Sequence, residues 1–465
     1  MKEAKTLGEL KKSGRPVLTV REEMRKNLVH CLQTGKRILP GIIGFDDTVI
    51  PDIENAILSG HHMVFLGERG QAKSRIIRGL VSLLDERIAI VQGCEINDNP
   101  FTPICRSCRR RVEKEGDALP VDWIGREQRY GEKLATPDVS IADIIGEIDP
   151  IKVAEGRYLA DEETIHYGLI PRTNRGIFAI NELPDLTEKV QVGLFNLMEE
   201  KDVQIKGYKI RLPLDVVIVA SANPEDYTSR GRIITPLKDR FDVQIRTHYP
   251  RSIQDEIVIM EQEAAPASQR SQPVEVPQFM KEILAHMTFE ARKSSEINQS
   301  SGVSVRVTIN NFESIISNAE KRALRLKEVE VVPRISDMHS VLASTGGKIE
   351  MEYVGEDKKE EELVEKLLNR ALTKVFDQYF SVNSLQKVID YFNSGWGVEV
   401  SDVMPSQDYL EGIKEIPGLK EAIRTLGTLE SPALMASATE FIMECLLLHQ
   451  KLNKEVEGGR ITYGK

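Results

Sequence analysis

The sequence has few cysteines and no long apolar run. Five cysteines in 465 residues are an odd number and too sparse for a disulfide-stapled fold, so we expect a reducing compartment, the cytoplasm. The longest apolar runs, such as 216–220, fall far short of the ~20 residues that a membrane helix needs. No charged and then apolar leader opens the chain. We therefore expect a protein without a membrane span.

Positive charge is also in short supply. The chain has 62 Lys and Arg residues against 72 Asp and Glu residues, a net charge of −10. This balance argues against general nucleic-acid binding, although it leaves room for a local basic surface. The chain does have the composition of a globular protein, 41% hydrophobic and 29% charged. It is also too long to fold around a single hydrophobic core, so we expect more than one domain.

One short stretch, residues 67–74, organises the rest of the chain. It follows an apolar run at 63–66, which indicates a buried strand, and it precedes a helical pattern at 75–81. Strand, glycine-rich turn, Lys-Ser and helix is the arrangement of a phosphate-binding P-loop. The eight candidate nucleotide-binding residues are Gly67, Glu68, Arg69, Gly70, Gln71, Ala72, Lys73 and Ser74.

The residue types of this stretch fit phosphate chemistry. Glycines let backbone N–H groups close around phosphate oxygens. We expect Lys73 to bind the β- and γ-phosphates of ATP and the Ser74 hydroxyl to bind Mg²⁺. Ala72 stands where such a loop usually has its last glycine. The alternative is an ordinary strand–helix turn.

Strand and helix patterns alternate around this loop. Helical patterns cover 20–34, 46–58 and 183–200, and buried strands are indicated at 88–91, 176–180, 216–221 and 243–246. This alternation predicts an α/β fold with a parallel sheet and helices on both faces. Period-two alternation at 203–214 predicts a hairpin, with its turn at 206–209. Residues 136–171 interrupt the rhythm and are interpreted as an insertion.

Polar residues follow two of the buried strands. Asn181 and Glu182 end one strand, and Asn223 ends the next. In a P-loop sheet, a strand-ending acidic pair supports Mg²⁺ with one group and polarises the attacking water with the other. Glu182 suits the water role, whereas Asn181 is a neutral amide that holds the metal through a water. Asn223 is placed for the γ-phosphate or the water; by itself it would indicate only a turn.

Two arginines are candidates for stabilising the developing phosphate charge. Arg240 lies just beyond the strand that ends at Asn223, and Arg306 opens a helical segment. A surface role is the alternative for each.

Three cysteines raise the question of a metal site. Cys94 is followed by the C-x-x-C pair of Cys105 and Cys108, and such a pair is a common zinc half-site. No second pair or nearby His pair completes the ligand set in sequence. We favour the alternative, a surface helix with incidental thiols and a solvated face formed by Arg109–Arg111.

Taken together, these segments resemble the AAA+ ATPases of the magnesium-chelatase and MoxR-like branch. The motifs are GERGQAKS (67–74), AINE (179–182), ASAN (220–223), PLKDRF (236–241) and SGVSVRVT (301–308), and the likeness covers about 42–326. The resemblance implies Walker A at 67–74, Walker B at 177–182, sensor 1 at Asn223, an arginine finger at Arg240 and sensor 2 at Arg306. It also implies the helix-2 insert at 136–171 and the pre-sensor-1 hairpin at 203–214.

The expected domains follow from these motifs. They are an N-terminal helical segment (1–40), an AAA+ ATP-binding core (41–263), a proline-containing linker (264–278), an α-helical lid with sensor 2 (279–345) and a helical C-terminal region (346–465). Ile43 and Gly44 lie in the turn ahead of the first strand, a segment that often packs near the nucleotide base in P-loop proteins of this layout. Within the last region, Ser431-Pro432 predicts a helix start and Cys445 a core position.

The function implied is an ATP-hydrolysing motor, with ATP and Mg²⁺ as its ligands, that remodels or matures a client protein. Members of this branch form homo-oligomeric rings, usually hexamers, and work with a partner that carries a von Willebrand factor A domain. Three alternatives stay open. They are the motor subunit of a magnesium chelatase, a nucleotide-sensing scaffold with little hydrolysis, for which Asn181 leaves room, and a bacterial enhancer-binding activator. The last is disfavoured because the chain lacks a Gly-Ala-Phe-Thr-Gly-Ala loop and a basic recognition helix near its end.

Overall fold

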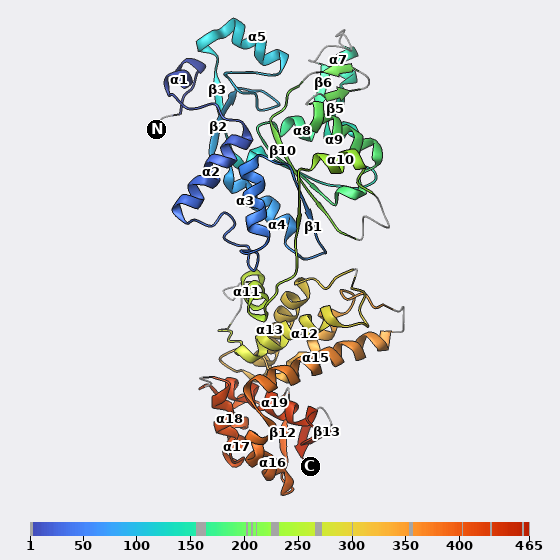
Figure 1. Ribbon diagram of the computed structural model, residues 1–465. Helices are drawn as coiled ribbons and strands as arrows, with labels where there is room; N and C mark the ends of the chain where they lie inside the picture. Colours follow the sequence, from blue (N-terminus) through green and yellow to red (C-terminus); the bar gives the residue numbers. More distant parts are fainter. Residues whose placement is uncertain are drawn as a thin grey trace. The chain divides into compact units, whose positions relative to one another are not determined.

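The chain divides into two compact units, residues 1–248 and 249–465, each described here by itself (Figure 1). The computed structural model describes residues 3–154, 164–200, 203–205, 208–210, 212–224, 232–265, 272–299, 301–352, 357–401, 403–427, 430–457 and 460–464. Parts of the predicted insertion (155–163), hairpin turn (206–207) and linker (266–271) therefore lie outside the described residues.

A five-stranded parallel sheet forms the centre of the first unit. Its strand order is β11-β1-β10-β7-β4, and every neighbouring pair is parallel. The strands are β1 (Met63–Leu66), β4 (Tyr130–Leu134), β7 (Gly176–Asn181), β10 (Val216–Ala222) and β11 (Val243–Arg246). The predicted parallel sheet is confirmed, and β4 is an edge strand that the sequence did not indicate. Since all strands run the same way, the segments after β1, β7 and β10 meet at one edge.

Helices cover both faces of this sheet, because successive strand residues point to opposite sides. Phe65 is buried with α2 (Val20–Thr34), α3 (Val49–Ser59) and α4 (Lys73–Gly79), whereas Val64 is buried with α9 (Glu188–Glu200) and α10 (Thr235–Arg240) (Figure 1). The cap of α2 explains its sharp start. Thr19 and Glu22 form a reciprocal capping box, so the helix begins at Val20 as predicted.

The helix expected at 183–200 begins later than predicted. Residues Leu183–Asp185 form a short 3₁₀ turn, and α9 starts only at Glu188. The reason lies at the end of β7, where Glu182 takes a left-handed backbone conformation with φ 56°. The chain therefore turns away from the strand before a helix can start.

Small antiparallel sheets flank the central one. β2 (Arg87–Val91) forms as predicted, yet it pairs antiparallel with β3 (Val121–Gly125) in a separate two-stranded sheet. Between them lies α5 (Arg106–Glu115). The insertion contains α6 (Ile141–Ile144), β5 (Gly146–Ile148), α7 (Pro150–Ala154), β6 (Ile165–Tyr167) and α8 (Leu169–Arg172). β8 (Val203–Ile205) and β9 (Tyr208–Ile210) pair antiparallel, which confirms the predicted hairpin. A short helix, α1 (Leu7–Lys12), lies near the N-terminus.

The second unit is built mainly of helices. They are α11 (Ile253–Glu263), α12 (Gln278–Lys293), α13 (Arg306–Leu326), α14 (Val341–Thr345), α15 (Asp357–Tyr379), α16 (Gln386–Asn393), α17 (Ser406–Glu415), α18 (Leu419–Thr425) and α19 (Pro432–Leu448). Ser431 caps α19 by accepting a hydrogen bond from the Leu434 N–H at 3.2 Å, and Cys445 is buried in the core, both as predicted.

This unit also holds a small sheet that the sequence did not predict. β12 (Val398–Val400), β14 (Arg460–Gly464) and β13 (Asn453–Glu457) form an antiparallel sheet in that order. The C-terminal region is therefore not wholly helical. The division between the units also precedes α11, whereas the predicted core ends at 263. Ile257 and Met260 of α11 pack into the core of the second unit, which explains the difference.

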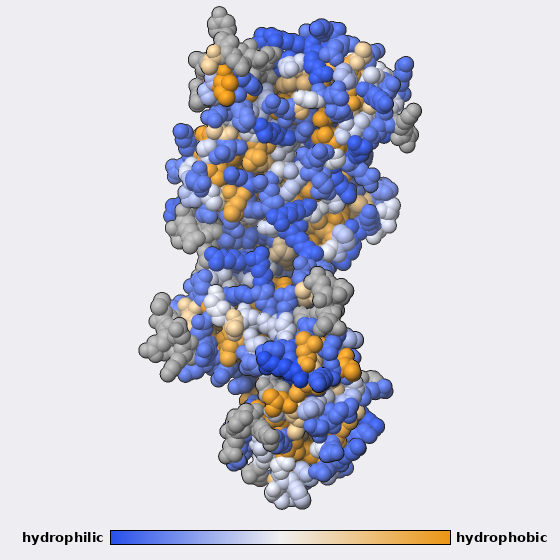
Figure 2. Space-filling view, turned by 180° about the vertical axis from the view of Figure 1, so that it is seen from behind, coloured by the Kyte–Doolittle hydropathy of each residue, from blue (hydrophilic) through white to orange (hydrophobic). Residues whose placement is uncertain are grey.

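The outer surface is largely hydrophilic. Figure 2 shows small groups of apolar residues among charged ones on the face it presents. Among the described residues, large apolar side chains that are strongly exposed include Val329, Ile151, Val403 and Trp396. Within the part of the chain that the structure describes, no helix is long and apolar enough to cross a membrane.

Candidate functional site

The loop between β1 and α4 holds the predicted phosphate-binding residues. Gly67 leaves β1 with its N–H donated to Ala222 O of β10 at 3.2 Å. Its missing side chain is essential, since a Cβ there would lie 2.0 Å from Thr247 Oγ1 and 2.2 Å from Gln71 Oε1. Gly70 and Ala72 both take positive φ, 77° and 56°. Alanine pays a steric penalty in this conformation that glycine does not. The departure seen in the sequence is therefore a strained position.

Lys73 lies at the centre of the site with its side chain buried. Its ammonium donates hydrogen bonds to Gly67 O, to Glu68 O at 2.8 Å and to Asn223 Oδ1 at 2.6 Å. The next residue, Ser74, is exposed in the first turn of α4. A lysine ammonium in this loop is placed to bind phosphate oxygens.

Asn223 connects the loop to the candidate water-polarising residue. While its Oδ1 accepts from Lys73, its Nδ2 donates to Glu182 Oε2 at 2.9 Å. The structure therefore brings together Lys73 from the start of α4 with Asn223 and Glu182 from the ends of β10 and β7, as the sequence analysis expected. Glu182 has the left-handed backbone noted above, and such strain in a non-glycine residue is common at functional sites.

Asn181 has a neighbour that sequence reasoning missed. Its Nδ2 donates to Glu132 Oε1 at 2.6 Å, and its Oδ1 accepts from Ser221 Oγ at 3.2 Å. Glu132 comes from β4, the strand that was not predicted. Arg78 of α4 donates two hydrogen bonds to this carboxylate, at 2.8 and 2.9 Å, and these bonds lower the pKa of Glu132 below its usual value. A carboxylate that is charged at neutral pH therefore lies beside the neutral amide.

A cavity of about 330 Å³ opens beside the loop. It is lined by Leu66, Gly67, Glu68, Gln71, Pro224, Lys238, Gln244, Arg246 and Thr247. Lys238 and Arg246 contribute positive charge to it. Gln71 is buried in its wall, where its Oε1 accepts from the Glu68 N–H at 3.1 Å and from Thr247 Oγ1 at 2.9 Å.

The predicted base-contacting residues, Ile43 and Gly44, lie in the turn before α3. Gly44 takes φ 77°, and Phe45 packs edge-on against His248 with ring centroids 4.8 Å apart. The same turn approaches α4, because a Cβ on Gly41 would lie 3.0 Å from the Arg75 guanidinium. The turn therefore adjoins the first turn of the P-loop helix.

Of the two candidate arginines, Arg240 lies in the first unit, where it is not part of the Lys73–Asn223–Glu182 cluster. Arg240 ends α10, where it pairs with Glu199 of α9 at 2.5 Å and lies over the Phe195 ring, with 37% of its side chain exposed. Arg306 is exposed at the start of α13 in the second unit.

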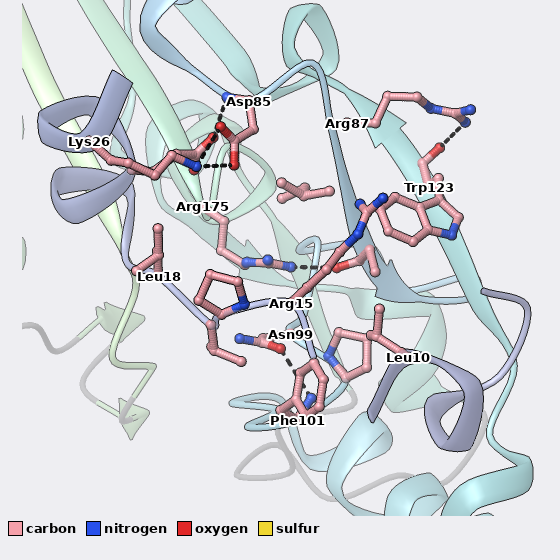
Figure 3. A pocket seen from close by; sticks show the side chains of 16 residues that line it. Leu10, Arg15, Leu18, Lys26, Asp85, Arg87, Asn99, Phe101, Trp123 and Arg175 are labelled. Carbon is pink, nitrogen blue, oxygen red and sulfur yellow. Dashed lines mark hydrogen bonds and ion pairs between the residues drawn. The ribbon is translucent and has the colours of Figure 1, made fainter. Parts of the chain in front are cut away.

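Another cavity, of about 280 Å³, lies beside the N-terminal segment (Figure 3). The Arg15 guanidinium lies 4.6 Å from the Trp123 ring centroid, Lys26 pairs with Asp85 at 3.0 Å, and Arg175 donates to Ala89 O at 2.7 Å. None of the described residues lining it belongs to the P-loop cluster, so it is not the candidate nucleotide site.

The chain is similar to known proteins. The family model of the Sigma-54 interaction domain matches residues 153–243. The magnesium-chelatase subunit ChlI homolog of Methanocaldococcus jannaschii is 27% identical over 200 residues, which cover 42% of this chain and 50% of that protein. The magnesium-chelatase 38 kDa subunit of Rhodobacter capsulatus is 26% identical over 232 residues, which cover 47% and 58%.

The match to solved structures is looser. A chain from the complex between subunits BchI and BchD of magnesium chelatase, based on a single-particle cryo-EM reconstruction, has 19% identity and a TM-score of 0.35, over 70% of this chain and 98% of that one. The chain spans about half the length of the first curated relatives it matches.

Proposed function

We propose that this chain, an AAA+ protein of the magnesium-chelatase and MoxR-like branch, binds ATP with Mg²⁺ and hydrolyses it to remodel or mature a client protein. The observation that carries the proposal is the hydrogen-bonded series from Lys73 through Asn223 to Glu182. It aligns a phosphate-binding cation, an amide and a carboxylate at one sheet edge. These are the groups that phosphoryl transfer to water requires.

The proposed roles follow from the contacts. Lys73 exchanges its bonds to Gly67 O, Glu68 O and Asn223 Oδ1 for phosphate oxygens. Asn223, no longer bonded to Lys73, orients the γ-phosphate or the attacking water. Glu182 accepts a hydrogen bond from that water and increases its nucleophilicity.

The residues present fit Mg²⁺, a hard cation that prefers oxygen ligands. Ser74 would bind it directly and Asn181 through a water, while the Glu132 carboxylate supplies the negative charge that Asn181 lacks. The metal would neutralise charge on the phosphates. In this proposal, Glu132 of β4 replaces the Walker B carboxylate that Asn181 lacks. This replacement favours ATP hydrolysis over a scaffold that only senses nucleotide.

Assembly and partners belong to the same proposal. We infer a homo-oligomeric ring, a hexamer, with Arg240 reaching the nucleotide of a neighbouring subunit and Arg306 acting as sensor 2. A protein with a von Willebrand factor A domain is the expected partner. The sparse cysteines support a cytoplasmic location. The alternative function, the motor subunit of a magnesium chelatase, is supported by the names of the relatives.

Titration with a fluorescent ATP analogue tests the proposal. Lys73→Ala should abolish binding, while Lys11→Ala, a surface lysine paired with Asp117, should bind as wild type does. Glu182→Gln should bind ATP and release no phosphate. Unchanged affinity in Lys73→Ala would refute the P-loop assignment.

Capture of proteins from the native host on ATP-loaded Glu182→Gln, compared with Lys73→Ala, would then identify client and partner.

A further inference from the structure

Three cysteines and one aspartate from the stretch 94–108 meet in the first unit. Cys94 follows β2, Asp98 lies in the next loop, and Cys105 and Cys108 begin α5. One potential ligand atom from each of the four lies within 4.8 Å of the others. The predicted helix and its exposed Arg109 and Arg110 are present, but the thiols are not incidental surface groups, because Cys105 and Cys108 are buried.

The loop backbone holds these groups in place. Asp98 is fully buried, and its two carboxylate oxygens accept hydrogen bonds from the N–H groups of Ile104 and Cys105, both at 2.9 Å. The Asp98 N–H lies 3.4 Å from Cys94 Sγ, and the Cys108 N–H lies 3.3 Å from Cys105 Sγ. Two sulfurs therefore already accept backbone hydrogen bonds, an arrangement that orients and stabilises metal-bound thiolates.

We propose that Cys94, Cys105, Cys108 and Asp98 bind a structural zinc ion. With Zn–S bonds of about 2.3 Å, a tetrahedral site places its sulfurs roughly 3.8 Å apart, so the observed spacing needs only a small contraction. Thiolate ligands select zinc over magnesium or calcium, which take oxygen. The sequence failed to complete the ligand set because its fourth member is a buried aspartate rather than a second pair.

The surroundings favour a negatively charged centre. Three thiolates and a carboxylate outweigh the charge of one Zn²⁺. The three cysteines line a cavity of about 360 Å³ together with Arg111, which also pairs with Glu115, and with Lys152 and Glu95. The positive end of the α5 dipole faces the same groups. The ion would close the loop of residues 94–108 and fix α5 against β2, which makes this a structural centre separate from the P-loop.

Metal analysis of the purified full-length protein tests this proposal. After preparation under reducing conditions without chelator and with equimolar Zn²⁺, then desalting, we expect about one zinc per chain. Replacement by Co²⁺ should give thiolate-to-cobalt charge-transfer absorption and the intense visible bands of a tetrahedral site. Cys94→Ser, Cys105→Ser and Cys108→Ser should each lose most of the metal, while the matched control Cys31→Ser, on α2, should keep it.

The variant Asp98→Asn tests whether Asp98 is a zinc ligand or only accepts the backbone hydrogen bonds of the loop. Its amide oxygen can still accept a backbone hydrogen bond, and we expect zinc affinity to fall about 10–100-fold with the three-thiolate cobalt absorption retained. Wild-type protein that retains no zinc and shows no cobalt absorption would overturn the proposal. So would a disulfide between two of the three thiols in protein isolated under native conditions, seen by mass spectrometry. Because both readouts use wild-type protein, misfolded variants cannot obscure the answer.

Discussion

The Asn181 side chain donates a hydrogen bond to Glu132 Oε1 at 2.6 Å, from the end of β7 to the neighbouring edge strand. In the proposed site, Asn181 stands where an aspartate would supply charge for the metal. Because Arg78 and Asn181 both donate to Glu132, that carboxylate stays ionised, and its pKa lies below the usual value. An ionised carboxylate, paired with Arg78, is therefore present one strand away.

This relationship predicts how hydrolysis depends on Mg²⁺. Glu132→Gln should raise the Mg²⁺ concentration for half-maximal ATP hydrolysis by about tenfold, since loss of a supporting carboxylate typically costs 10–100-fold in metal affinity. Asn181→Asp should place two carboxylates side by side and lower the melting temperature without Mg²⁺, with recovery when Mg²⁺ is added. The double variant Glu132→Gln, Asn181→Asp has the amide and the carboxylate exchanged between the two positions. It should need nearly the wild-type Mg²⁺ concentration for half-maximal ATP hydrolysis. An unchanged Mg²⁺ requirement in Glu132→Gln would remove Glu132 from the site.

Ala72 gives a prediction about stability. It adopts φ 56°, a conformation that costs an alanine about 1–2 kcal/mol, whereas glycine loses roughly 0.5–1 kcal/mol through its freer unfolded chain. Ala72→Gly should therefore stabilise the first unit by up to about 1 kcal/mol in urea unfolding. The same exchange at the buried helical residue Ala56 should destabilise it by about 1 kcal/mol. A loss of stability in Ala72→Gly would mean that the loop conformation is not strained.

Arg240 predicts whether the active site is shared between subunits. It pairs with Glu199, apart from the cluster around its own Lys73, so it would act on a neighbour's nucleotide. Arg240→Ala should bind ATP and hydrolyse it about 10³–10⁵-fold more slowly. Mixing it with Glu182→Gln should restore partial activity, because some interfaces then combine an intact arginine with an intact glutamate. No recovery despite demonstrated co-assembly would contradict a shared site, and an active monomer would exclude it.

His62 predicts a dependence of stability on pH. Burial, together with the nearby Arg21 and His61, lowers the pKa of His62 to about 4, against a smaller opposing effect of Asp242. A histidine with a lowered pKa in the folded state stabilises the protein above its unfolded pKa of 6.5, and this contribution is lost as the pH falls from 6.5 towards 4. The loss should amount to about 3 kcal/mol.

His62→Gln should remove this component of the pH dependence, while His30→Gln, an exposed histidine on α2, should not. Urea unfolding at pH 7 and pH 4.5 in a Trp396→Phe background measures it, since Trp123 then reports on the first unit alone. Equal slopes of stability against pH in both variants would show that His62 is accessible to protons in the folded state.

The sequence was informative wherever a local pattern determines local structure. The strand at 63–66 and the capped helix at 20–34 have the predicted bounds, because apolar periodicity and caps act within a few residues. Long-range pairing was harder to foresee. β4 is short and its burial pattern is intermediate, so it has no apolar signature, and its pairing with β7 alone brings Glu132 to Asn181. The approach of Asp98 to three thiols likewise depends on loop hydrogen bonds that no spacing reveals.

The contact between Gln71 and Thr247 has a mechanical consequence. Thr247 follows β11, and the second unit begins two residues later, at Tyr249. If the loop closes on phosphate as proposed, a movement of Gln71 would act on Thr247, which the Leu66 carbonyl also holds through the Thr247 N–H at 2.8 Å. Gln71→Ala removes the hydrogen bond to Thr247. We expect this variant to bind ATP, but ATP should no longer change protease cleavage around residues 249–252. Cleavage that still changes with ATP would show that this hydrogen bond does not couple the loop to residues 249–252.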